Sequence, residues 1–331
     1  MAAVPAPARE IRLATWDAGL TRSGPGLLLR DIAGRQAQVL AAQAVIAALD
    51  ADVLVLVGVD YDAAGSALAA LGGDYPYRLA LRPNSGVPTG LDLDGDGQPN
   101  GPRDAQGYGR FPGQAGIAVL SRLPLGALRD FSGFLWRDLP GADLPPDLTA
   151  EAAAVLRLAT TGFYDLAVND GGATLHLLIY AATPPVFDGP EDRNGRRNAD
   201  ETGFWLHLLR GDLPFPPPPA PFVILGQPNL DAVDGDGRPQ ALRALLASPL
   251  LHDPQPRGTS GHDDPGQRGD PALDTMLLKS GAGLRLDYIL PSADLTVTGA
   301  GVLWPAPSDP LAATLQTASD HRPVWVTIAL P

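Results

Sequence analysis

Runs of apolar residues bounded by polar turns recur along the chain and predict a protein built mainly of strands. The segment Asp52–Val59 (DVLVLVGV) is apolar at consecutive positions, which is typical of a strand covered on both faces. Gln114–Ser121 and Thr174–Ala181 have the same character. The pattern predicts further strands at Ile11–Trp16, Phe222–Gly226, Leu286–Leu290, Thr296–Trp304 and Arg322–Leu330.

Apolar residues at helical spacing occupy three segments between these strands: Arg30–Asp50, Arg197–Arg210 and Pro239–Ala247. Phe215–Pro221 is rich in proline, so we expect it to be extended. This order of elements predicts an α+β fold in which two stacked sheets are flanked by helices. We expect residues 1–10 to form a flexible N-terminal segment and residues 11–331 to form a single domain.

Charge and composition narrow the range of functions. The 331 residues include 37 acidic and 24 basic side chains, and the formal charge of −13 argues against nucleic acid as a partner. There are no cysteines, which excludes disulfides and thiolate metal sites. No segment approaches the roughly 18 apolar residues of a membrane span. No signal peptide is visible, so we expect a cytoplasmic location by default, and a secreted or periplasmic one if a leader was removed.

Two polar loops each allow two interpretations. Leu91–Asn100 (LDLDGDGQPN) spaces Asp92, Asp94 and Asp96 as in the first half of a calcium loop, although the distal glutamate of an EF-hand is missing. It is either a structural Ca²⁺ site or a solvated Asp/Gly turn. The charged stretch Asp188–Glu201 is either a salt-bridged surface loop or the rim of a functional cleft.

The C-terminal part of the chain contains the residues with the clearest catalytic chemistry. Asp320 and His321 precede the last strand, and Asp287 lies in an earlier strand segment, LDYIL. A histidine within reach of a carboxylate can form the imidazole–carboxylate pair that orients a general acid or base. The sequence therefore predicts a pairing of His321 with an aspartate.

The order of short motifs supports a family assignment. The segments TWDAGL, VGVD, AGIAVLSRLPL, ILGQPN, LDYIL and SDHRPVW follow one another along the chain, as do the longer loops GLDLDGDG, TPPVFDGPEDRNGRRN and WPAPSDPLAA. From about Ile11 to Leu330 the chain resembles the endonuclease/exonuclease/phosphatase superfamily, and most of all a bacterial branch that has these loops. The resemblance implies a four-layer αββα sandwich of two mainly antiparallel sheets, like DNase I. It also implies Mg²⁺-dependent phosphoester hydrolysis at one end of the sheets.

The polar residues that the family places in its active site are mostly replaced in this chain. Gly58 stands where the resemblance implies a metal-binding glutamate, and Gln227 stands where it implies the aspartate of a Gly-Asp-x-Asn turn. A glycine offers no ligand atom, and a glutamine cannot accept a proton near neutral pH. The other substituted family positions are Asp17, Phe163, Ala181 and Ala199; the retained ones are Asn229, Asp287, Asp320 and His321.

Two hypotheses follow from these substitutions. In the first, the protein is a catalytically impaired relative with a binding or other non-catalytic role, whose partner is a phosphoester-containing small molecule or another protein. In the second, it is an active metal-dependent phosphodiesterase or phosphatase with a site rebuilt around Asp17, Asp287, Asp320 and His321. The second hypothesis needs Mg²⁺ or another divalent cation, and a weak site between Asp17 and Asp320 is the candidate for it.

Overall fold

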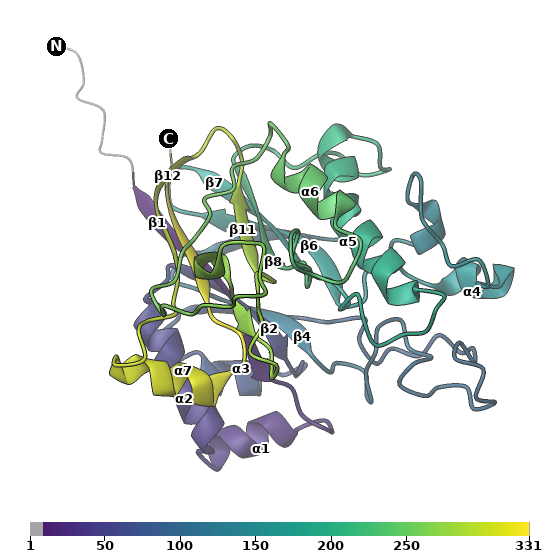
Figure 1. The fold of residues 1–331 in the computed structure, drawn as a ribbon, viewed down its shortest axis with the longest axis horizontal. Coiled ribbons are helices and arrows are strands. Elements are labelled where there is room, and N and C mark those ends of the chain that lie inside the picture. The colour runs from purple at the N-terminus through teal and green to yellow at the C-terminus, as the bar shows by residue number, and fades with distance from the viewer. Residues whose placement is uncertain (1–8, 331) are drawn as a thin grey trace.

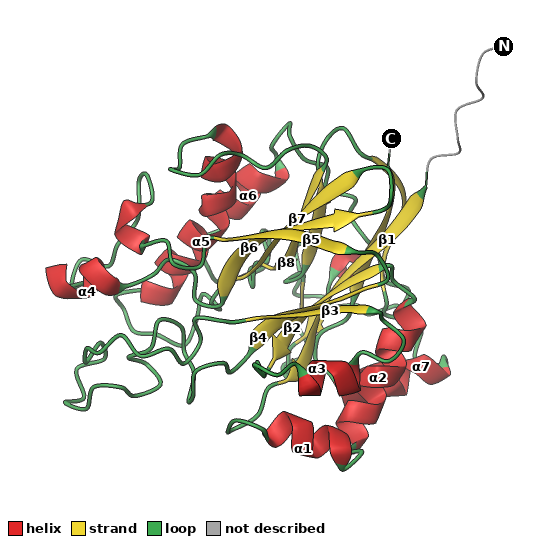
Figure 2. Ribbon diagram, turned by 180° about the vertical axis from the view of Figure 1, so that it is seen from behind, coloured by secondary structure: helices red, strands yellow, loops and turns green. Residues whose placement is uncertain are grey.

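The computed structural model describes residues 9–330, and its two sheets stack face to face with helices on both outer faces (Figures 1 and 2). The first sheet has the order β12 (Thr296–Val302), β13 (Val324–Ala329), β1 (Glu10–Leu20), β2 (Val53–Val59), β4 (Gly116–Ser121), β3 (Tyr77–Leu81). The second has the order β11 (Tyr288–Pro291), β8 (Phe222–Gln227), β7 (Thr174–Ala181), β6 (Gly162–Asn169), β5 (Leu125–Asp130). The predicted αββα sandwich is confirmed.

Helices cover the outer face of each sheet. The first sheet is covered by α1 (Leu27–Ala33), α2 (Ala37–Leu49), α3 (Ser66–Leu71) and α7 (Pro310–Ala318). The second sheet is covered by α5 (Arg193–Arg210) and α6 (Gln240–Leu246). The remaining elements are α4 (Ala150–Val155), the short 3₁₀ helices Trp136–Asp138 and Pro271–Leu273, and a small hairpin of β9 (Met276–Leu277) and β10 (Gly283–Leu284).

Three apolar layers hold the four structural layers together. The central layer consists of inward-facing residues of both sheets, such as Val55 and Leu177, which are fully buried. The outer layers lie between each sheet and its helices, and Trp16 and Phe204 are buried in them. Because alternate residues of a strand point to opposite faces, strands covered on both sides must be apolar throughout. The continuous apolar runs in the sequence are explained by this requirement.

Parallel pairing at two places brings the carboxyl ends of neighbouring strands to the same edge of each sheet. Most neighbouring strands are antiparallel, but β1 pairs in parallel with β2, and β7 pairs in parallel with β8. The carboxyl ends of two parallel neighbours lie at the same edge of a sheet. The turns that follow these strands are therefore close in space.

The single helix predicted over Arg30–Asp50 is wrong. The segment contains most of α1 and all of α2, and the two helices are bent by 81° relative to each other. Gly34 ends α1, and Arg35 has a left-handed φ of 51°, which cannot continue a helix. Within residues 9–330, no single helix is long and apolar enough to cross a membrane.

Other predicted boundaries also shift. α5 begins at Arg193 rather than Arg197, so much of the charged stretch Asp188–Glu201 is helical. β5 and β6 were not predicted, because β5 is largely exposed and β6 contains the buried Asp165. Asp165 is paired with Arg129 and His176, which lie far from it in sequence. Residues 1–8 of the segment expected to be flexible lie outside the described residues, and β1 already begins at Glu10.

Candidate functional site

Five residues from separate segments meet at the end of the two sheets. Asp17 and Gly58 lie in β1 and β2, and Gln227 ends β8. Asp287 directly precedes β11, and His321 lies shortly before β13. We call them the substituted centre: Asp17, Gly58, Gln227, Asp287 and His321. The sequence predicted all five as family positions, and the structure brings them together.

The side chain of Asp17 fills the space beside Gly58. A Cβ on Gly58 would lie 2.4 Å from Asp17 Oδ1, and Gly58 has a φ of +68°. Opposite β4, Gly58 is the extra residue of a bulge, whereas opposite β1 the extra residue lies on β1, between Asp17 and Leu20. A glutamate at position 58 would collide with Asp17 and would also strain the backbone.

Both carboxylate oxygens of Asp17 accept hydrogen bonds from the protein. Oδ1 accepts the Gly19 N–H at 3.0 Å, and Oδ2 accepts Gln227 Nε2 at 2.9 Å. The carbonyl of Asp17 accepts the Ser319 hydroxyl at 2.7 Å, which fixes the strand at this point. Gln227 is only 4% exposed, so its amide spans the two sheets inside the protein. The orientation of the amide follows from its neighbour, because its oxygen would be repelled by the Asp17 carboxylate.

His321 and Asp287 form the predicted imidazole–carboxylate pair. His321 Nδ1 lies 2.8 Å from Asp287 Oδ2, which also accepts the Thr275 hydroxyl at 2.8 Å. Burial by itself would lower the pKa of His321, but the charge and hydrogen bond of Asp287, helped by Asp17 and Asp320, raise it to about 9. The imidazole is therefore a cation at neutral pH.

Three further predicted positions border the substituted centre. Asn229 has a left-handed φ of 58°, and its Nδ2 donates to the Ala182 carbonyl at 3.0 Å. Ala181 pairs with Gln227 between β7 and β8 and is buried in the central layer. Asp320 is exposed beside His321.

The other two predicted positions lie in the α5 layer. Phe163 is fully buried there, and its ring centroid is 4.6 Å from that of Phe204. Ala199 is a half-buried residue of α5. Phe163 therefore contributes to packing under α5.

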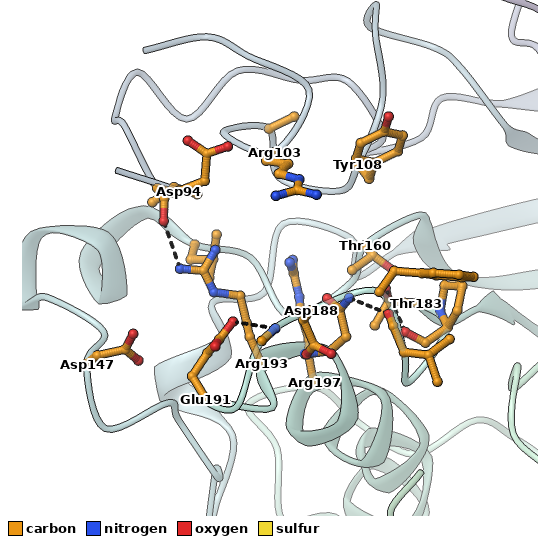
Figure 3. Close-up of a pocket in the computed structure, with 18 residues that line it drawn as sticks. Asp94, Arg103, Tyr108, Asp147, Thr160, Thr183, Asp188, Glu191, Arg193 and Arg197 are labelled. Atoms are coloured by element: carbon orange, nitrogen blue, oxygen red, sulfur yellow. Dashed lines mark hydrogen bonds between the residues drawn. The ribbon is translucent and has the colours of Figure 1, made fainter. Parts of the chain in front are cut away.

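A cavity of about 960 Å³ lies between the 93–108 loop and the start of α5, next to the end of β7 (Figure 3). We call it the arginine cleft. Thr183, which follows β7 and Ala182, lies in its wall, whereas the five residues of the substituted centre do not line it. Its charged lining consists of the arginines Arg103, Arg193 and Arg197 and the acids Asp94, Asp147, Asp188 and Glu191. A ligand of drug-like size would fit in this volume.

Arg103 and Arg197 approach the arginine cleft from opposite sides (Figure 3). Arg197 is 6% exposed, and its Nε and Nη2 donate to the carbonyls of Leu158, Gln106 and Arg157. Burial lowers the pKa of Arg197 to about 10, so the side chain is still cationic at neutral pH. Its Nη1 makes no hydrogen bond to residues 9–330, and the residue lines the cavity.

Among residues 9–330, none of the four lining acids forms an ion pair with Arg103, Arg193 or Arg197, and their negative charges outnumber these arginines by one. Asp143, which lies outside the lining, pairs with Arg196 and with Arg238. Asp188 and Glu191 accept backbone N–H groups of Asn194 and Gly189, and Arg193 donates to the Leu93 carbonyl. The alternative that the charged stretch is only a salt-bridged surface loop is therefore incomplete.

Glu201 is an important residue that the sequence did not single out. Its buried carboxylate accepts the N–H and hydroxyl of Thr160 at 2.6 and 2.7 Å and the Thr183 N–H at 2.7 Å. Burial raises the pKa of Glu201 to about 7 despite these bonds and the nearby charge of Arg197. Since Thr160 and Thr183 both line the arginine cleft, Glu201 fixes two of its walls.

Comparison with known proteins now decides the family. The model of the Endonuclease/Exonuclease/phosphatase family matches residues 14–321. The chain belongs to this family. No curated protein matches it.

Solved structures of the family have the same fold at low identity. A family member from Beutenbergia cavernae DSM 12333 is 20% identical, with a TM-score of 0.53 over 97% of this chain and 72% of that one. One from Leptotrichia buccalis C-1013-b is 16% identical, with a TM-score of 0.54 over 97% and 100%. Sphingomyelinase C from Streptomyces griseocarneus is 16% identical, with a TM-score of 0.52 over 96% and 99%.

The residues of the substituted centre do not fit the divalent cation that the family implies. Position 58 offers no ligand, and both Asp17 oxygens already accept hydrogen bonds. The cationic His321 lies nearby and would repel a metal ion. The weak site between Asp17 and Asp320 stays a prediction, and this geometry disfavours it.

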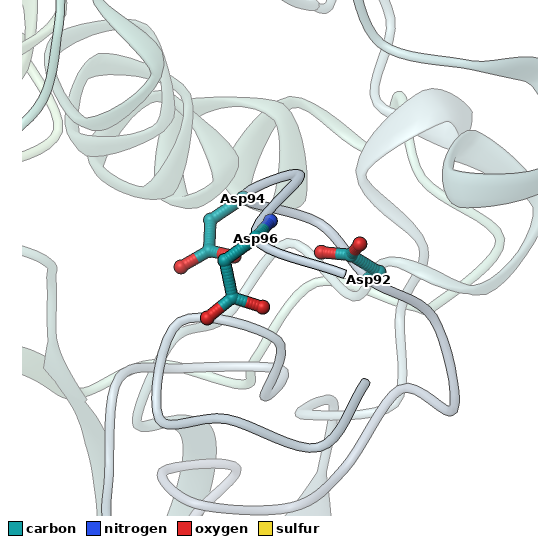
Figure 4. Close-up of side chains that lie close together, drawn as sticks. All are labelled: Asp92, Asp94 and Asp96. Carbon is teal, nitrogen blue, oxygen red and sulfur yellow. The ribbon is translucent and has the colours of Figure 1, made fainter. Parts of the chain in front are cut away.

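The three aspartates of the 91–100 loop do come together. One carboxylate oxygen from each of Asp92, Asp94 and Asp96 lies within 4.8 Å of the others, and all three side chains are exposed (Figure 4). Asp92 also accepts the N–H groups of Gly95 and Gly97, as expected of a tight polar turn. The cluster could hold a metal ion, and structural Ca²⁺ here stays a prediction.

The contact between Asp17 and position 58 can be tested by a double-mutant cycle. Gly58→Ala should destabilise the protein by about 3 kcal/mol, because it combines backbone strain with a collision against Asp17. In an Asp17→Ala background the collision is removed, and the cost should fall to about 1 kcal/mol. Urea unfolding measures both values.

Gly65→Ala is the matched control for this cycle. Gly65 has a φ of +67°, and a Cβ there would have nothing within 4 Å. It should cost about 1 kcal/mol in either background. Equal costs of Gly58→Ala with and without Asp17 would contradict the contact.

The charge of His321 can be followed by its titration. We expect its imidazole to stay doubly protonated at pH 7.5, and Asp287→Asn should lower its pKa. Folding raises this pKa from 6.5 to about 9, so the stabilisation is fully present below pH 6.5 and is lost as pH rises through 9. Nitrogen NMR of the ring measures the pKa, and a midpoint below 7 in the wild type would show the assignment to be wrong.

Proposed function

We propose that this protein is a catalytically impaired member of the Endonuclease/Exonuclease/phosphatase family that binds a small phosphoester in the arginine cleft. The observation that carries the proposal is the closure of the substituted centre. Asp17 occupies the space beside Gly58, and its carboxylate is held by Gly19 and Gln227. The groups that hydrolysis needs are replaced by groups that bond to one another.

The remaining side chains supply little of the chemistry of hydrolysis. A general base must accept a proton from water, but Gln227 is a neutral amide and His321 is already protonated at neutral pH. Positioned acid–base groups and electrostatic stabilisers contribute about 10²–10⁴-fold each. Replacement of the implied metal ligand and of the implied proton acceptor should together lower the rate by several orders of magnitude.

The arginine cleft has the chemistry of a phosphoester site. The guanidinium groups of Arg103 and Arg197 face one cavity, and arginine forms charge-assisted, often bidentate, hydrogen bonds with phosphate. Tyr108 and Phe187 also line the cavity and are 65% and 84% exposed, so they offer apolar surface to the rest of a ligand. The net charge of −13 favours a small ligand over a nucleic acid.

One observation favours the alternative of an active hydrolase with a rebuilt site. The His321–Asp287 pair is intact at 2.8 Å, and its cationic imidazole could protonate a leaving group. That alternative still needs a group to activate water, and Asp17 is the remaining carboxylate at the centre. The two functions differ in whether ester is consumed.

Hydrolysis assays separate the two functions. We expect no turnover of p-nitrophenyl phosphate or bis(p-nitrophenyl) phosphate above background with Mg²⁺, Mn²⁺ or Ca²⁺, because no base or metal ligand set is in place. Colorimetric release of nitrophenol is the measurement, with circular dichroism to confirm folding. A metal-dependent rate that disappears in His321→Ala would instead establish the rebuilt active site.

Ligand binding in the arginine cleft is tested with phenyl phosphate. Calorimetry should detect binding, and Arg103→Gln should weaken it about tenfold because one charge-assisted contact is lost. Arg210→Gln is the control, since Arg210 ends α5 far from the cleft. Binding that is absent, or that Arg103→Gln leaves unchanged, would refute the ligand assignment.

A further inference from the structure

A second group of polar atoms lies outside both the substituted centre and the arginine cleft. His262 Nε2, Gln267 Oε1 and Asp274 Oδ2 are buried, and none of them has a hydrogen-bond partner among residues 9–330. We call these three residues the His262 cluster. They belong to the long loop that leads into β9 and packs against β10. Buried polar atoms are nearly always satisfied, so three in one place require a cause.

The spacing of two of these atoms suits an ion between them. A Cβ on Gly283 would lie 1.9 Å from Asp274 Oδ2 and 3.1 Å from His262 Nε2, so the two atoms are at most about 5 Å apart. They make no hydrogen bond with each other. A metal ion about 2 Å from each ligand bridges atoms up to about 4 Å apart, which lies within this limit. The absence of a side chain at Gly283 lets the Asp274 carboxylate lie directly against its backbone.

Charge at the His262 cluster points to a cation. Asp274 is 1% exposed, and its Oδ1 accepts Gln267 Nε2 at 2.8 Å, whereas Oδ2 has no donor. Burial, and then the negative charges of Asp231, Asp234 and Asp264, disfavour the ionised form of Asp274. Protonation of Asp274 would remove its charge, but Oδ2 makes no hydrogen bond to any group of residues 9–330. A cation satisfies the oxygen and the surplus negative charge together.

We propose that the His262 cluster binds a divalent transition-metal ion of the Zn²⁺ class. One imidazole nitrogen, one carboxylate oxygen and one amide oxygen are ligands that such ions accept, and water would complete the coordination. The ion would join the 262–274 loop to the β9–β10 hairpin. Thr275, the residue after Asp274, donates to Asp287, so the bound ion would also stabilise the segment that supports His321.

Trp304 lies beside the proposed site, so its fluorescence can report metal binding. The His262 ring stacks on the indole of Trp304, with centroids 5.7 Å apart and planes inclined by 12°. A paramagnetic ion bound to His262 Nε2 would therefore lie close to one particular tryptophan. Co²⁺ should quench the fluorescence of Trp304 selectively among the five tryptophans of the chain.

The experiment uses the full chain without an affinity tag, because a histidine tag would itself bind metal. Calorimetry with Zn²⁺ should show one micromolar or tighter site, and saturation should raise Tm by a few degrees. Co²⁺ should quench part of the tryptophan fluorescence. His262→Ala and Asp274→Asn should each weaken Zn²⁺ binding at least tenfold and abolish the quenching.

Two control variants assign the signals to the site. Trp304→Phe should remove the Co²⁺ quenching but keep the Zn²⁺ stoichiometry. The double variant Asp92→Asn, Asp94→Asn should leave both signals unchanged, because its loop carries the separate aspartate cluster. Circular dichroism checks that each variant is folded, and His262→Gln replaces His262→Ala if the latter is not.

Three outcomes would overturn the proposal. Folded wild-type protein that binds no Zn²⁺ at micromolar concentration would mean that the cluster holds water only. Zn²⁺ binding that is unaffected in folded His262 and Asp274 variants would place the ion elsewhere. Binding of Ca²⁺ in preference to Zn²⁺ at these residues would contradict the stated class of metal.

Discussion

The close approach of Asp17 to Gly58 is the contact on which the rest of the functional end depends. With Oδ1 of Asp17 2.4 Å from the position of a Cβ, only glycine fits at position 58 while Asp17 keeps this conformation. The register of β1 against β2 shifts directly after Asp17, where the Asp17 carboxylate accepts the Gly19 N–H. A local feature of two strands thus replaces a metal ligand with an internal hydrogen bond.

Electrostatic balance then explains why the centre is stable as a closed unit. The buried His321 cation lies between the carboxylate of Asp287, which it contacts, and that of Asp17, which also raises its pKa. Burying charges is costly unless they are paired and hydrogen-bonded, and here each charged group has a partner of opposite charge or a donor, although Oδ1 of Asp287 has no partner within residues 9–330. A divalent ion would compete with His321 for the same two carboxylates. The protonated imidazole therefore serves as the positive charge of this centre.

The sequence predicted the two-sheet fold and every residue of the substituted centre, because both depend on patterns that are local or follow a family order. Prediction failed where a distant partner decides the conformation. Asp165 sits in the buried strand β6 only because Arg129 and His176 pair with it. The left-handed Arg35 that separates α1 from α2 has no strong sequence signal. For the charged stretch Asp188–Glu201 the sequence left a surface loop and the rim of a cleft open, because the choice depends on which acids and arginines pair in the fold.

Buried charge at the start of α5 supports a role for the arginine cleft beyond packing. Arg197 and Glu201 lie one turn apart on α5, both are almost fully buried, and each bonds to neighbouring loops rather than to the other. Apolar side chains at these positions would pack without the cost of removing two charges from water. Glu201 fixes the threonine walls, and Arg197 lines the cavity with no hydrogen bond at Nη1 among residues 9–330. Arg197 thus keeps a positive charge in the wall of the cavity, beside a substituted centre that lacks a general base. This arrangement is suited to binding an anion rather than hydrolysing it.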